Sequence, residues 1–244
     1  ELLETAYETD PTNVAVRIEL ANALYAAPDV DLFTVRSAVE HLNGKGAEVP
    51  TGDSDAEVCT EGASSPRSPG RFLAISVEDH DGLQVLWAER DRIKRVSRLV
   101  VDGVLRRRAE AFAEAPVEVR SKGFLLAALT RLSRRLLGVR DALQATESAL
   151  YVDQESDPPG ALVACSPTTE DRDRVERSLC RHEEGVSQAA SWLKRRNELF
   201  SSEQTSLLLD LLGTHREALR TQAACPASNT TDADPAGVQR PPVE

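Results

Sequence analysis

The feature that most constrains the fold is a run of mostly apolar residues that alternate steps of four and three between positions 125 and 150. Its members are Leu125, Leu129, Leu132, Leu136, Val139, Leu143, Thr146 and Leu150. Because this spacing returns to one face of an α-helix at every turn, it forms an a/d seam more than three heptads long. The sequence therefore predicts a long helix that packs along other helices.

Helical spacing of apolar residues recurs on both sides of this segment. It predicts further helices over about 82–114, 168–200 and 201–223. Only residues 71–77 have strand-like character, and aromatic residues, which favour strands, make up just 4% of the chain. The predicted fold class is all-α, with a bundle of about four long helices over residues 71–224.

A shorter helical group is predicted at the start of the chain. Ala6 precedes the break at Asp10-Pro11, and the next helix carries a set of small and large apolar residues at helical spacing. That set is Leu20, Ala21, Ala23 and Leu24. With these residues the segment 4–42 resembles one unit of a tetratricopeptide repeat, although Phe33 stands where the family has Ala.

The resemblance implies a helical hairpin whose inner face binds an extended peptide or a neighbouring helix. It implies that Leu20 and Leu24 fill the groove between two helices, and that Asn22 occupies the position of a carboxylate-gripping Asn in some family members. Ile18 stands where those members have Lys, so the resemblance implies only half of that clamp.

Two segments are predicted to be disordered. Residues 43–70 and 225–244 are rich in Gly, Pro, Ser and acids, and they cannot bury enough apolar area to offset the chain entropy of ordering. The predicted organisation is a hairpin over 1–42, a linker over 43–70, a helical bundle over 71–224 and a tail over 225–244.

Charge is distributed unevenly along a chain of net charge −11. The basic residues gather in the predicted helices 90–108 and 131–140, and most of them are arginines. Four arginines, Arg131, Arg134, Arg135 and Arg140, are candidates for partner binding. Two interpretations remain open: these helices pack against the chain's own acidic segments, such as 169–176, or they bind an external anionic partner such as RNA or an acidic protein.

No residue pattern predicts a catalytic, cofactor-binding or metal site. The acidic run before residue 82 lacks the ligand spacing of a calcium loop, and acids are favourable at a helix N-terminus in any case. The four cysteines are widely spaced, and we expect free thiols because a chain of 244 residues does not need disulfides to fold. No apolar run is long enough to span a membrane, so we expect a soluble protein of the cytoplasm or an organelle interior.

These observations favour a non-catalytic helical scaffold or adaptor that binds other protein subunits through its helical surfaces. The alternative is an RNA- or phosphate-binding subunit of a ribonucleoprotein that uses the two arginine-rich helices.

Overall fold

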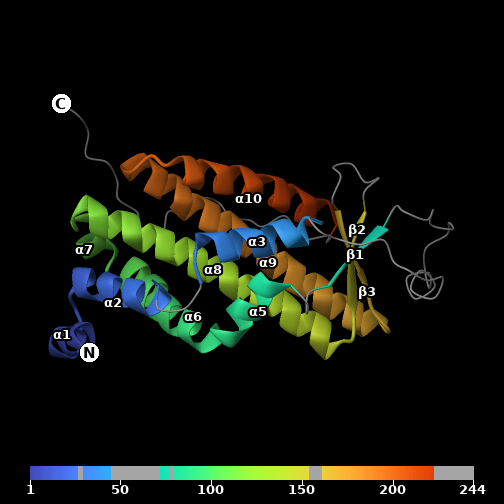
Figure 1. Cartoon of the computed structure of the whole chain (residues 1–244), viewed down its shortest axis with the longest axis horizontal. Coiled ribbons are helices and arrows are strands. Elements are labelled where there is room, and N and C mark those ends of the chain that lie inside the picture. The colour runs from blue at the N-terminus through green and yellow to red at the C-terminus, as the bar shows by residue number, and fades with distance from the viewer. Residues whose placement is uncertain (27–29, 45–71, 77–79, 154–160, 223–244) are drawn as a thin grey trace.

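The computed structural model describes residues 1–26, 30–44, 72–76, 80–153 and 161–222, and two long helices run through it (Figure 1). Helix α8 spans Val117–Ala145 and α9 spans Thr169–Leu199. They pack along each other, with Ser178 Oγ of α9 donating a hydrogen bond to the Gly138 carbonyl of α8 at 2.9 Å. A third long helix, α10 (Glu203–Gln222), lies against α9. The all-α fold class is confirmed.

The predicted seam forms the core of α8. Leu129, Leu132, Leu136, Val139 and Leu143 are all buried. The helix nevertheless ends at Ala145, and Leu150, the last member of the seam, is buried in a strand instead. Glu147 follows the helix with φ 49°, in the left-handed region, so the chain turns there although the apolar spacing continues.

Three shorter helices lie at the start of the chain. Helix α1 covers Leu2–Thr9, α2 covers Val14–Ala26 and α3 covers Leu32–Leu42. Asn13 caps α2 by accepting a hydrogen bond from the Val16 N–H at 3.1 Å. Asn43-Gly44 ends α3, with Gly44 at φ 86°, a conformation that glycine adopts without strain.

The prediction of one continuous helix over 82–114 is wrong. The chain forms α5 (Asp81–Ala88), α6 (Arg90–Ser97), the π-helix η1 (Arg98–Arg106) and α7 (Ala109–Ala113). Apolar side chains still face inward through the whole segment, which is why its spacing suggested one helix. A nine-residue π-helix is unusual, because most π-helical segments are single turns.

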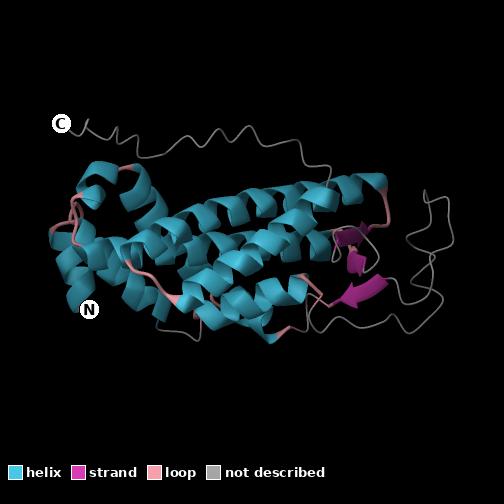
Figure 2. Cartoon of the chain, turned by 90° about the horizontal axis from the view of Figure 1, so that it is seen from above, coloured by secondary structure: helices cyan, strands magenta, loops and turns pink. Residues whose placement is uncertain are grey.

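A small antiparallel sheet lies at one end of the molecule, far from α1 and α7 (Figures 1 and 2). Strand β1 (Phe72–Ile75) pairs with β2 (Ala149–Asp153), which pairs with β3 (Ala161–Cys165). Of these strands, the sequence predicted only β1. The register pairs Ile75 with Leu150, and both are buried.

One apolar core joins the N-terminal helices to the long ones. Ile18 of α2, Val35 of α3 and Leu132 of α8 belong to the same buried cluster. The boundary between 1–42 and 71–224 therefore does not separate two cores. The segments predicted to be disordered, 43–70 and 225–244, lie outside the described residues except for Asn43 and Gly44.

The expectation of free thiols is wrong for the described cysteines. Cys165, at the end of β3, and Cys180, on α9, are both in disulfide bonds. Chain length alone does not decide whether cysteines pair, so the argument from size fails here.

Candidate functional site

The four candidate arginines of α8 do not act as one group. Arg140 is 8% exposed, and its guanidinium lies over the ring of Trp87 at 4.5 Å from the centroid. Arg90 lies over the same ring at 4.4 Å, so two cations contact this indole. Contact with the electron-rich face of an aromatic ring stabilises a cation, and Arg140 is therefore best explained by packing against α5.

Arg131, Arg134 and Arg135 lie on adjacent turns of α8, as their spacing predicts. Arg134 is exposed and donates a hydrogen bond from Nη1 to Ser97 Oγ of α6 at 3.1 Å. Arg131 and Arg135 are half-buried. Their Nε atoms are buried without a hydrogen-bond partner. None of the three forms an ion pair with a carboxylate within the described part of the chain.

Two more arginines belong to this surface. Burial, followed by the charges of Arg135, Arg134 and Arg106, lowers the pKa of Arg131 to about 10. Burial also lowers the pKa of Arg135, and Arg134 and Arg181 act in the same direction while Glu184 opposes them. Each shift reports cations from different helices close enough to repel one another. We call Arg131, Arg134 and Arg135, together with Arg106 of η1 and Arg181 of α9, the arginine face.

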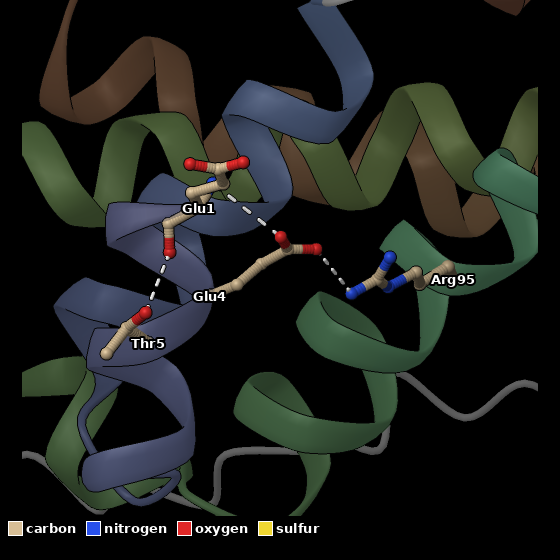
Figure 3. A network of polar contacts seen from close by, with 4 residues as sticks. All are labelled: Glu1, Glu4, Thr5 and Arg95. Carbon is tan, nitrogen blue, oxygen red and sulfur yellow. Dashed lines mark hydrogen bonds and ion pairs between the residues drawn. The ribbon is translucent and has the colours of Figure 1, made fainter.

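The basic segment 90–108 behaves differently. Arg95 pairs with Glu4 of α1 at 3.1 Å, a contact that joins α1 to α6 (Figure 3). Its other ion pairs are local to the segment: Arg92 with Glu89, Lys94 with Asp91 and Arg106 with Asp102, at 3.0 to 3.3 Å. The expectation that basic helices pack against the chain's own acids thus describes this segment, but not Arg131 or Arg135.

The three candidate residues of α2 are partly inside the core. Leu20 is 3% exposed, and Leu24 is partly buried against the same core cluster. Asn22 is half-buried. Leu20 therefore stabilises the fold and is not free to meet a peptide. The resemblance to a tetratricopeptide repeat stays a prediction.

A pair of buried histidines between α9 and α10 was not predicted as a site. His182 and His215 are both 0% exposed, and their Nε2 atoms are 2.8 Å apart. Asn43 Oδ1, at the end of α3, faces Nδ1 of His215, so that nitrogen carries the proton. His215 Nε2 then accepts from His182 Nε2–H. This assignment leaves His182 Nδ1 as a buried acceptor without a partner.

The other two histidines also form a pair. His41 of α3 stacks on His80 with ring centroids 4.3 Å apart, and His41 Nε2 lies 2.8 Å from the Ser76 carbonyl. His80 Nδ1 accepts from the Leu83 N–H and caps α5. His80, which stands in the acidic run before residue 82, is thus a helix cap. The spacing of Leu179, His182 and Val186 could have placed His182 in the core, but no sequence pattern pairs it with His215.

The described residues contain no group of three or more His, Cys, Asp or Glu side chains that could hold a metal ion. None of the described helices combines the length and the apolar character that crossing a bilayer requires. No family model, curated protein or solved structure matches the chain.

Proposed function

We propose that this chain is a non-catalytic helical adaptor that binds a partner protein through the arginine face. The observation that carries the proposal is the pair Arg131 and Arg135, which are half-buried and have no carboxylate partner among the described residues. A charge removed from water is normally matched by an opposite charge or by hydrogen bonds. An acidic group of a partner would supply that match.

The packing around these arginines supports the proposal. Leu132 and Leu136 are buried beside them, so the helix that presents the arginines is held by the core. Removing the guanidinium groups should leave that core unchanged. Binding and folding can therefore be separated experimentally.

The alternative is an RNA- or phosphate-binding subunit. Arginine is favoured over lysine for phosphate contacts because its planar group donates two hydrogen bonds in parallel, and all five cations of the arginine face are arginines. Against RNA stands the pairing of Arg92, Lys94 and Arg106 with nearby acids, which neutralises part of the basic segment 90–108.

The test compares partners captured by the immobilised chain and by the triple variant Arg131→Gln, Arg134→Gln, Arg135→Gln. We expect the variant to melt at the same temperature or slightly higher and to lose partners that the parent retains. The matched control replaces three arginines elsewhere on the chain, Arg172, Arg174 and Arg177, with Gln. These three are exposed on α9, so the control changes net charge equally.

A triple variant that captures the same partners as the parent would contradict the proposal. RNA binding by the parent that weakens steeply with salt would favour the alternative. A contact with about three phosphates of a single strand predicts a log–log slope of roughly −2.

A further inference from the structure

The arginine face is held in position by its surroundings. Gly185 of α9 lies directly against Arg135, because a β-carbon at position 185 would overlap Arg135 Cγ and come within 3.3 Å of Arg135 Cβ. Arg134 is tied to Ser97 of α6. The aliphatic part of Arg135 is thus packed between α8 and α9. These side chains are partly ordered before any ligand arrives, which reduces the entropy cost of binding.

The face also carries more positive charge than one carboxylate can neutralise. Arg131 has Arg135, Arg134 and Arg106 as neighbouring cations, and Glu184 is the acid that acts on it. Arg106 belongs to η1 and Arg181 to α9, so three helices contribute to one patch. Like charges gathered in this way repel, and a multiply charged anion relieves that repulsion more fully than a single carboxylate.

We propose that Arg131 and Arg135 bind a tetrahedral oxyanion on a partner protein, namely a phosphate or sulfate group esterified to one of its side chains. This inference rests on the proposed adaptor function and names the chemistry that the arginine face recognises. A tetrahedral ester group presents three free oxygens, so the two guanidinium groups can each donate to a different oxygen and a third oxygen remains for a further donor. A carboxylate presents two.

The geometry of the face argues for a compact group on a protein. A nucleic acid needs cations spaced along its backbone and is helped by aromatic rings for base stacking. Here Arg92 and Lys94 of the neighbouring basic segment are paired with local acids, and Trp87 is covered by Arg90 and Arg140. Among the described residues, Arg106 is the one member of the arginine face that is paired with a carboxylate, and a compact patch of this kind fits one charged group.

The disulfide bonds are relevant to whether the arginine face binds a phosphate ester or a sulfate ester. Cys165 and Cys180 are in disulfide bonds, and disulfides form and persist mainly in oxidising compartments. Proteins that pass through such compartments meet sulfated as well as phosphorylated partners. Phosphate and sulfate esters share the tetrahedral oxyanion, and the experiment separates them.

The test measures the binding of four fluorophore-labelled peptides that are identical except at one position. That position holds Tyr, phosphotyrosine, sulfotyrosine or Glu, and glycines flank it. Fluorescence anisotropy with the full chain should show at least one ester peptide bound ten-fold or more tightly than the Tyr and Glu peptides. The ester with the higher affinity identifies the source.

Variants locate the site. Arg131→Gln with Arg135→Gln should reduce affinity for the ester peptide at least ten-fold, and Arg131→Lys with Arg135→Lys should reduce it less because charge remains while the planar donor pair is lost. Gly185→Ala should also weaken binding, since it displaces Arg135 without altering any charge. Arg172→Gln with Arg177→Gln is the charge-matched control and should bind as the parent does.

Equal affinity for the ester, Glu and Tyr peptides would overturn the inference. If the arginine variants still lost their protein partner in that case, the adaptor function would stand and the partner's acid would be a carboxylate. The chain could instead bind an oligouridylate more tightly than any peptide, and lose that binding in Arg131→Gln with Arg135→Gln. That result would overturn both the ester inference and the adaptor function in favour of the RNA-binding alternative.

Discussion

Charged side chains on two sides of α9 differ in whether they have a partner of opposite charge. On the side facing α10, the Glu183 side chain is 4% exposed and accepts hydrogen bonds from the Nε atoms of Arg216 at 2.7 Å and Arg220 at 2.8 Å. On the side facing α8, Gly185 makes room for Arg135, which has no carboxylate partner within the described chain. Residues 183 and 185 are about 200° apart on a helix, so the two environments lie back to back.

The difference separates structural charge from charge available to a ligand. The pairing of Glu183 with two arginines joins α9 to α10 and satisfies the buried carboxylate. Arg131 and Arg135 form no ion pair that links two helices within the described chain, and the repulsion between them opposes folding. Removing charge should therefore destabilise the protein on one side of α9 and leave it unchanged or more stable on the other.

The largest effect is expected at Glu183. Glu183→Ala leaves the guanidinium groups of Arg216 and Arg220 without their acceptor and opens a small cavity. We expect a loss of roughly 3–5 kcal/mol of unfolding free energy, measured by urea denaturation. The neighbouring exposed Glu184, replaced by Ala, is the control and should change stability by less than about 0.5 kcal/mol. A loss below about 1 kcal/mol for Glu183→Ala would mean that the ion pairs of Glu183 do not stabilise the fold, and the contrast between the two sides of α9 would be wrong.

Acid should weaken the same α9–α10 interface through the histidine pair. Burial lowers the pKa of His215 to about 4, and burial, followed by His215 and Arg135, lowers the pKa of His182 well below its ordinary value. The unfolded chain binds these protons near pH 6.5 and the folded chain does not. Stability is therefore full above about pH 6.5 and falls as pH decreases toward 4.

For His215 alone the expected loss over that range is about 3 kcal/mol, at about 1.4 kcal/mol per pH unit. Urea denaturation at pH 7.0, 6.0, 5.0 and 4.5 measures it. His215→Gln removes one titrating group and should flatten the profile between pH 6.5 and 4.5. An unchanged profile in this variant would show that acid acts elsewhere, for example on carboxylates.

Apolar periodicity predicted the long helices because α8, α9 and α10 each bury a line of apolar side chains in the same core. It could not predict the sheet, since strands of four or five residues carry too short a pattern. Leu150 shows the limit clearly. It continues the spacing of α8, yet the turn at Glu147 places it in β2 opposite Ile75.

The site was predictable in part. Helix geometry placed Arg131, Arg134 and Arg135 together, but the sequence could not show that Arg140 lies on Trp87, 53 positions earlier, or that Arg106 and Arg181 approach from other helices. The pairing of His182 with His215 depends in the same way on how α9 packs on α10. Contacts between distant segments follow from tertiary packing, which one sequence does not specify residue by residue.

The smallest effect is expected at Arg131, and its sign is the informative part. Arg131→Met keeps an unbranched apolar stem while it removes a half-buried charge that three other arginines repel. Replacing poorly matched buried charge with an apolar side chain of similar size is often neutral or stabilising, so we expect a gain of roughly 0–1 kcal/mol. The gain should shrink as salt is added, because screening already weakens repulsion between partly exposed charges in the parent. Thermal melting at 20 mM and 500 mM NaCl measures both the sign and this dependence. A loss above about 1 kcal/mol would mean that Arg131 stabilises the fold, and the two sides of α9 would then use charge in the same way.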